Sequence, residues 1–274
     1  MTAIYVDPVF RQEVLLHLFR NFGRTASRYP LLLAVTGPTG EGKTFQTDEV
    51  LRQLGVPAFR IESGELESEL AGQPAERIRL SYLRAGSGEG EFAALVINDL
   101  DTALGDWGSQ VQYTVNRQAV FGQLMALCDA PTRINNQECA RVPVIVTGND
   151  FTRLYAPLTR AGRMRTFSWT PGSEQRIPII ATIFPWLDLP AVRRLASTQP
   201  DEPVAFWVAV AGALDDDVTI EAIGRLGEDE ALRMAKKGKL PPVDYAAIGV
   251  QEISRVATRV AKSSAHKNFL KRGD

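Results

Sequence analysis

Histidine and cysteine are scarce in this chain, which limits the kinds of active site that it can build. Two histidines and two cysteines occur among 274 residues, too few for a histidine metal cluster or a disulfide framework. We expect Cys128 and Cys139 to be reduced thiols, as in a reducing compartment. With only His17 and His266, a Ser–His–Asp triad has no support. We place His17 at the edge of an amphipathic helix and His266 in a solvated tail.

An excess of charge of either sign is also missing. The 31 basic and 32 acidic residues leave a net charge of −1, so no global positive field would gather nucleic acid or an anionic membrane. The apolar runs fall far short of the roughly 20 residues of a membrane helix, and the first residues lack the pattern of an export signal. We therefore expect a cytoplasmic protein, with neither a membrane nor a nucleic acid as its partner.

Strand and helix patterns alternate in the first two thirds of the chain. Apolar, often β-branched runs predict five strands, at residues 31–36, 58–61, 92–97, 142–147 and 165–169. Helix-period stretches lie between them, at residues 46–54, 75–84 and 115–128. This alternation predicts an α/β fold with a five-stranded, mostly parallel sheet that helices cover on both faces.

Helical patterns alone follow Pro171. They cover residues 174–184, 190–197, 204–214, 229–237 and 245–261. We therefore divide the chain into an N-terminal helix and linker (1–29), an α/β subdomain (30–172) and a small all-helical lid (173–274). Asp7 is expected to cap the first helix, with Pro8 in its first turn. The basic C-terminal tail from Lys262 is expected to fray.

A glycine-rich turn lies between the first predicted strand and the next predicted helix. Its glycines leave room for successive backbone N–H groups to point at an anion, with a helix N-terminus behind them. The lysine adds a positive charge for the β and γ phosphates, and the threonine offers a hydroxyl to Mg²⁺. The turn predicts a P-loop that binds ATP or ADP with Mg²⁺. Its residues are Gly37, Pro38, Thr39, Gly40, Glu41, Gly42, Lys43 and Thr44.

Two further strand ends supply candidate catalytic side chains. Asn98 and Asp99 follow the third strand, where an acidic group can order Mg²⁺ and polarise the attacking water. Asp99 is the leading candidate for this work, with Asn98 beside the nucleotide; the alternative is a solvated strand end. Asn149 follows the fourth strand and can orient water near the γ phosphate without adding charge. Its alternative is a simple Asn–Asp turn.

Two arginines three residues apart, Arg160 and Arg163, precede the fifth strand. Neither is expected to reach the phosphates of its own subunit. In a ring, an arginine in this place points into the neighbouring site, and such residues speed hydrolysis by roughly three to five powers of ten. The alternative is an ordinary pair of surface residues.

Taken in this order, the P-loop, acidic strand end, asparagine, arginine pair and helical lid resemble the AAA+ ATPase family. Several strings are more specifically similar to green-type Rubisco activases of plants and cyanobacteria. They include residues 63–68, 71–72, 74–75, 97–101, 112–116, 144–151, 154–158 and 162–164. The Asn98-Asp99 pair is unusual for the superfamily, and it is what the activases are expected to show. The resemblance runs from about residue 30 to 185 and continues weakly through the lid.

The resemblance implies a hexameric ring that uses ATP hydrolysis to release inhibitory sugar phosphates from Rubisco. Leu70, Ala71 and Gly72 match its first central-pore loop, where Leu70 would grip the client; on residue type alone, a buried helix-edge leucine is the stronger interpretation. Trp107 falls where a second pore loop is expected, or it packs as a plug. The implied compartment is a bacterial cytosol or carboxysome, or the chloroplast stroma if a transit peptide was removed.

Departures from the activase pattern leave alternatives open. The plant N-terminal specificity domain and C-terminal redox cysteines are expected to be absent, and Ala211 stands where the family carries a second sensor arginine. One alternative is a remodelling ATPase with a different protein client. Another is a DNA-associated AAA+ ATPase, and a third is a nucleotide-dependent scaffold that does not hydrolyse ATP, suggested by Ala211 and Asn98.

Overall fold

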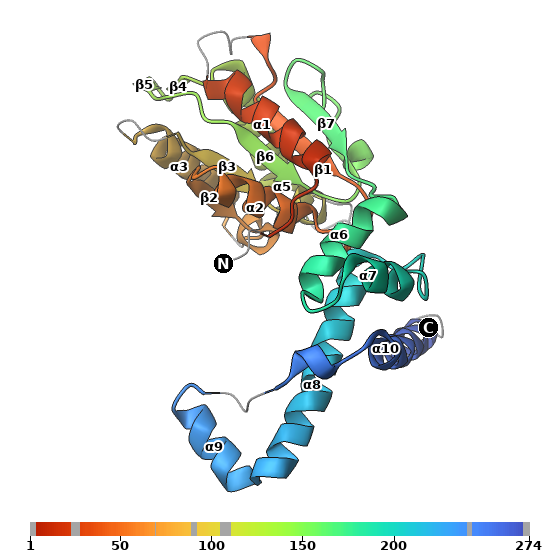
Figure 1. Cartoon of the computed structure of the whole chain (residues 1–274). Helices are drawn as coiled ribbons and strands as arrows, with labels where there is room; N and C mark the ends of the chain where they lie inside the picture. Colours follow the sequence, from red (N-terminus) through yellow and green to blue (C-terminus); the bar gives the residue numbers. More distant parts are fainter. Residues whose placement is uncertain are drawn as a thin grey trace. The chain divides into compact units, whose positions relative to one another are not determined.

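Two compact units make up the chain (Figure 1). The computed structural model describes residues 4–22, 28–68, 70–88, 92–104, 111–239 and 243–270. One unit is Val6–Thr170, and the other is Pro171–Asp274 together with Met1–Tyr5. None of the helices in the described ranges is both long and apolar enough to cross a bilayer.

A five-stranded parallel sheet forms the centre of the Val6–Thr170 unit and confirms the predicted α/β fold. Its strands are β1 (Leu32–Thr36), β2 (Ala58–Ile61), β3 (Ala94–Ile97), β6 (Val144–Thr147) and β7 (Met164–Ser168). They lie in the order β2-β3-β6-β1-β7, all parallel. Every residue of β3 and β6 is buried, as expected for central strands covered on both faces. The residues that follow β1, β3 and β6 therefore meet at one edge of the sheet.

Helices surround this sheet, and a separate two-stranded hairpin, which the sequence patterns did not predict, lies between α5 and β6 in the chain. The helical segments are α1 (Pro8–Phe22), α2 (Lys43–Gln53), η2 (Ser63–Leu66), α3 (Gln73–Gly86), α4 (Leu100–Leu104), α5 (Val111–Asp129) and η3 (Phe151–Arg153). The hairpin pairs β4 (Arg133–Ile134) with β5 (Gln137–Glu138). Asn135 and Asn136 form its turn with φ of 49° and 64°, the left-handed backbone that a two-residue hairpin needs.

Helix α1 begins and packs through specific polar contacts. The Asp7 carboxylate accepts hydrogen bonds from the N–H groups of Val9 (2.8 Å) and Phe10 (3.2 Å), which confirms the predicted cap. The prediction for His17 was wrong. Its ring is fully buried, because α1 lies against the sheet and the carbonyl of Val144 accepts from Nε2 at 3.1 Å. Burial lowers the pKa of His17 to about 3, so the ring is neutral.

Helices alone form the described part of the Pro171–Asp274 unit. They are α6 (Ser173–Ile183), α7 (Leu189–Ala196), α8 (Val204–Leu226), α9 (Glu228–Lys236), η4 (Tyr245–Ala247) and α10 (Val250–Leu270). Its core gathers around the buried rings of Phe184 and Trp207, which meet edge to face at 6.5 Å. Ala211 packs at the border of this core.

Two helices of this unit are longer than their patterns predicted. Helix α8 does not end at Leu214, because the acidic turn that follows is bonded to neighbouring segments. There Asp217 accepts from Arg259 at 2.8 Å and Asp215 accepts from Tyr245 at 3.0 Å. The segment from Lys262, which was expected to fray, is helical as far as Leu270 at the end of α10.

Candidate nucleotide-binding site

The turn between β1 and α2 has the backbone that a phosphate-binding loop needs. Gly37, Gly40 and Gly42 have φ of 145°, 81° and 78°, values that side-chain-bearing residues seldom adopt. A Cβ atom on Gly37 would lie 2.0 Å from the carbonyl oxygen of Trp169. In the part of the chain that the structure describes, no side chain caps the start of α2, so the N–H groups of its first turn are left for a ligand. The loop therefore fits the phosphates of a nucleotide.

Trp169 supports this loop, a role that sequence reasoning missed. Its indole N–H donates to the carbonyl of Glu41 at 2.7 Å, and its backbone N–H donates to the carbonyl of Thr36 at 2.7 Å. The ring is 2% exposed and meets Phe10 edge to face at 5.2 Å. No local pattern could reveal these contacts, because they depend on how β7 pairs with β1.

The ammonium group of Lys43 joins the loop to the end of β6. It donates to the carbonyls of Gly37 (2.9 Å) and Pro38 (2.8 Å) and to the side-chain oxygen of Asn149 (3.0 Å). Thus two predicted site residues from elements about 100 positions apart, Lys43 and Asn149, are in direct contact. The other predicted loop residues, Thr39, Gly40, Glu41, Gly42 and Thr44, lie in the same turn or in the first turn of α2.

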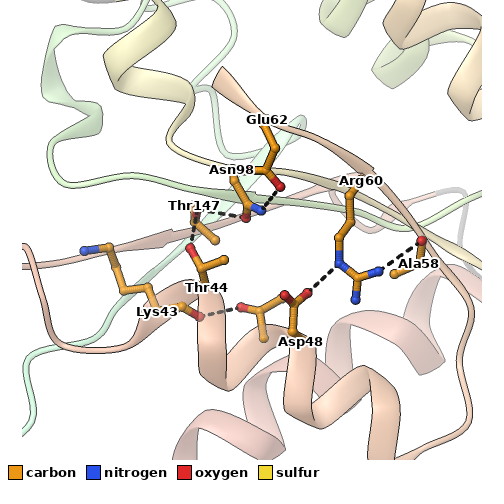
Figure 2. A network of polar contacts seen from close by, with 9 residues as sticks. Lys43, Thr44, Asp48, Ala58, Arg60, Glu62, Asn98 and Thr147 are labelled. Atoms are coloured by element: carbon orange, nitrogen blue, oxygen red, sulfur yellow. Dashed lines mark hydrogen bonds and ion pairs between the residues drawn. The ribbon is translucent and has the colours of Figure 1, made fainter. Parts of the chain in front are cut away.

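A chain of hydroxyl and amide groups continues from the loop across the sheet edge (Figure 2). The hydroxyl of Thr44 lies 3.4 Å from that of Thr147. Thr147 in turn donates to Asn98 Oδ1 at 3.3 Å and accepts from the backbone N–H of Asp99 at 3.1 Å. Asn98 then donates to the carboxylate of Glu62 at 2.9 Å. The two residues predicted to serve Mg²⁺, Thr44 and Asp99, are therefore both bonded to Thr147.

Charges at this edge perturb one another. Burial raises the pKa of Asp99, and the nearby carboxylate of Asp101 raises it further, while Lys43 opposes this shift. Burial likewise lowers the pKa of Lys43 against the attraction of nearby carboxylates. Asp99 also has a φ of 49°, an uncommon backbone for a residue other than glycine. Perturbed charges and an unusual backbone at one place are typical of functional sites.

Asp101 is a second residue that sequence reasoning gave no role. One carboxylate oxygen accepts from the backbone N–H groups of Asn149 (2.7 Å) and Asp150 (2.9 Å). The other oxygen is buried and has no hydrogen-bond partner among the described residues, and a Cβ atom on Gly148 would lie 2.5 Å from it. Asp101 thereby ties the segment after β3 to the segment that carries Asn149. An acidic residue two positions after Asp99 was the available signal.

The two candidate arginines differ in their surroundings. Both outer nitrogens and Nε of Arg163 are engaged within its own chain, with Asp129 at 2.9 and 2.7 Å and with the carbonyl of Pro157 at 2.8 Å. Arg160 is exposed, and its side chain bonds to none of the residues that the structure describes. Of the pair, only Arg160 is thus available to a neighbouring molecule without breaking internal bonds.

The residues matched to a client-gripping loop lie just before α3. Leu70 is 65% exposed, so the interpretation as a buried helix-edge leucine was wrong. Ala71 is exposed as well, and Gly72 caps α3 with a φ of 82°. Trp107 lies outside the described residues.

Fold and site together define a class of protein. A parallel sheet with a glycine loop after its first strand, β1, and with acidic and amide side chains at the ends of β3 and β6, is the architecture of P-loop nucleotide-binding proteins. The chain belongs to the AAA family, the ATPase family associated with various cellular activities, whose model matches residues 33–171.

Comparison with curated proteins gives a more specific similarity. The chain is 39% identical to ribulose bisphosphate carboxylase/oxygenase activase B, chloroplastic, of Hordeum vulgare over 254 residues, which is 88% of this chain and 60% of that protein. It is 41% identical to activase 2, chloroplastic, of Nicotiana tabacum over 243 residues, 82% of this chain and 55% of that protein. The chain thus spans between half and two thirds of the length of these relatives.

Proposed function

We propose that this protein hydrolyses ATP and uses the energy to remodel Rubisco, releasing inhibitory sugar phosphates. The observation that carries the proposal is the contact of Lys43 with Asn149 at 3.0 Å, in a P-loop whose sheet edge also presents Asp99. The client is proposed from the similarity to activases, which extends over 82–88% of the chain in the two relatives described above.

Each residue of the site has a part in the proposed hydrolysis. The backbone N–H groups of Gly37 and of residues 39–44, together with the ammonium of Lys43, bind the phosphates of ATP or ADP. Thr44 and Asp99 would hold Mg²⁺, which would neutralise phosphate charge, and Asp99 polarises the attacking water. Asn149 orients that water, with Lys43 holding its side-chain oxygen. Asn98 keeps the end of β3 in place beside the nucleotide.

Assembly and compartment are parts of the same proposal. Residues 30–172 act as the nucleotide-binding subdomain and 173–274 as a lid. Subunits form a ring, which the resemblance to the activases implies to be a hexamer. In this ring Arg160 reaches the nucleotide site of the neighbouring subunit. Leu70, Ala71 and Gly72 contact the client in the central pore. The protein works where Rubisco is found, in a bacterial cytosol or carboxysome, or in a chloroplast stroma.

The decisive experiment starts from Rubisco blocked by its sugar-phosphate substrate. The protein and Mg·ATP are added, and carboxylation is followed. We expect activity to recover with ATP, and not with ADP or with Lys43→Ala. ATP hydrolysis without recovery would reject Rubisco as the client and leave the ATPase standing. Calorimetry that detects binding of neither Mg·ATP nor Mg·ADP would reject the whole proposal.

A further inference from the structure

The string Gln-Tyr-Thr-Val-Asn at residues 112–116 belongs to the resemblance to the activases, and the proposed hydrolysis gives it no role. Its last residue, Asn116, lies on α5 and is 7% exposed. The side-chain oxygen of Asn116 accepts from the backbone N–H of Gly72 at 2.9 Å. Its side-chain nitrogen donates to the backbone carbonyl of Ser68 at 2.7 Å. One buried amide thus holds both ends of the segment that carries Leu70.

The segment has further internal bonds that keep the same shape. The backbone N–H of Leu70 donates to the hydroxyl of Ser68 at 3.1 Å, and the carbonyl of Leu70 accepts from the N–H of Gln73 at 3.3 Å. Gly72 adopts the left-handed backbone that begins α3. The apolar side chain of Leu70 nevertheless remains 65% exposed. We name Ser68 and Leu70–Gly72 the Leu70 loop.

A single exposed leucine is ordinary on a protein surface, so the exposure by itself identifies nothing. The exposure is informative because a buried side chain, Asn116, bonds the backbone on both sides of Leu70. We call Asn116 with these two hydrogen bonds the clamp. An amide on a helix is normally exposed, and burial is tolerated only when its polar atoms are bonded. Here the hydrogen bonds of Asn116 go to the backbone of the loop and not to the core. The side chain therefore serves the conformation of the loop.

We infer that Asn116 is a positioning residue that holds the Leu70 loop in the shape in which Leu70 contacts the client. The inference rests on the proposed function, in which this loop grips Rubisco. A loop that is already ordered loses less conformational freedom when it binds. Without the clamp, Leu70 meets the client in many orientations. A smaller fraction of the ATP hydrolysis cycles then moves the client.

The test uses the full chain and three variants with a matched control. Asn116→Leu keeps the size of the side chain and removes both hydrogen bonds. Asn116→Asp keeps the oxygen that accepts from Gly72 and removes the donor to Ser68. Leu70→Ala removes the contact itself. Gln123→Leu is the control, because Gln123 is an amide on the same helix that makes no hydrogen bond to the described residues of the loop.

Two rates are measured for each protein, ATP hydrolysis and recovery of inhibited Rubisco. We expect Asn116→Leu to recover Rubisco at least tenfold more slowly with ATP hydrolysis within about twofold of wild type. The rate of Rubisco recovery by Asn116→Asp should lie between those of wild type and Asn116→Leu. Both rates of Gln123→Leu should match wild type. Adding Asn116→Leu to Leu70→Ala should slow recovery no further, because the clamp acts only through Leu70. A purely structural defect would instead add to the effect of Leu70→Ala.

The outcomes separate the inference from the proposed function. Rubisco recovery at the wild-type rate by Asn116→Leu, alongside slow recovery by Leu70→Ala, overturns the inference and leaves the function intact. Should Asn116→Leu fail to fold in a thermal unfolding assay, Asn116→Asp decides, and recovery at the wild-type rate in that variant overturns the inference. A wild-type protein that hydrolyses ATP but never recovers Rubisco overturns both.

Discussion

The side-chain amide of Asn98 donates a 2.9 Å hydrogen bond to the carboxylate of Glu62. Asn98 is 2% exposed, and its oxygen is occupied by the hydroxyl of Thr147. A carboxylate at position 98 would lose this donor and face Glu62 at hydrogen-bonding distance. The contact gives a physical reason for the amide in the Asn98-Asp99 pair, which is unusual for the superfamily.

Replacing the hydrogen-bond donor at position 98 by an acceptor tests this explanation. We expect Asn98→Asp to lower the free energy of unfolding by about 1–3 kcal/mol, since it places two carboxylates together near the core. ATP hydrolysis should fall as well. Adding Glu62→Gln should restore most of both quantities, because glutamine can donate to the new carboxylate. Urea unfolding and steady-state ATPase assays measure them, with Glu62→Gln alone as the control. An Asn98→Asp variant as stable as wild type would contradict the explanation.

The geometry of Asp101 predicts two separable effects on hydrolysis. Asp101→Ala removes the acceptor for the N–H groups of Asn149 and Asp150. We expect kcat to fall roughly tenfold to a hundredfold through misplacement of Asn149, with little change in nucleotide affinity. Asp101→Asn keeps an accepting oxygen and should retain much more activity. Equal losses in the two variants would argue against a positioning role.

The charge of Asp101 predicts a change in pH dependence. Burial and Asp101 raise the pKa of Asp99, and the proposed mechanism needs Asp99 ionised. Activity is therefore lost as the pH falls through this raised value. Removing the negative charge in Asp101→Asn lowers the pKa of Asp99, so the acid limb of kcat/KM should move to lower pH. An acid limb that stays in place would remove Asp99 from the rate-controlling groups.

The two arginines should respond differently to alanine. Arg163→Ala breaks the internal bonds to Asp129 and Pro157, so we expect a loss of stability of about 1 kcal/mol, matched by Asp129→Ala. Arg160→Ala should leave thermal unfolding unchanged and slow hydrolysis by at least a hundredfold. Mixing Arg160→Ala with Lys43→Ala subunits should recover part of the activity if sites are shared between subunits. Normal hydrolysis by Arg160→Ala would exclude it from that role.

His17 predicts how stability depends on pH. Its pKa is about 3 in the folded chain against 6.5 for an ordinary histidine, so the unfolded chain binds the additional proton between these values. The contribution of His17 to the free energy of unfolding is complete above pH 6.5. It falls by about 1.4 kcal/mol per pH unit as the pH drops from 6.5 towards 3. We expect wild type to lose about 2 kcal/mol more than His17→Gln between pH 7 and pH 5 in urea unfolding. Parallel losses would contradict a neutral buried ring.

Much of this protein follows from its sequence alone. The five strands, the three longer helices between them (α2, α3 and α5) and the P-loop could be predicted, because each depends on residues within a short window. A β-branched run favours a strand wherever it lies, and glycines at Gly37, Gly40 and Gly42 permit a backbone that other residues resist. The order of these elements also carried the resemblance to the AAA+ family. Local chemistry was sufficient for each of these conclusions.

Tertiary structure alone decided which side chains meet. The contacts of Lys43 with Asn149, of Trp169 with Glu41 and of Asp101 with the amide of Asn149 join residues 48 to 128 positions apart. They depend on the order β2-β3-β6-β1-β7 and on the pairing register of its strands, which no short window contains. The burial of His17 and the engagement of Arg163 have the same origin, since the partner of each lies on a different segment of the chain.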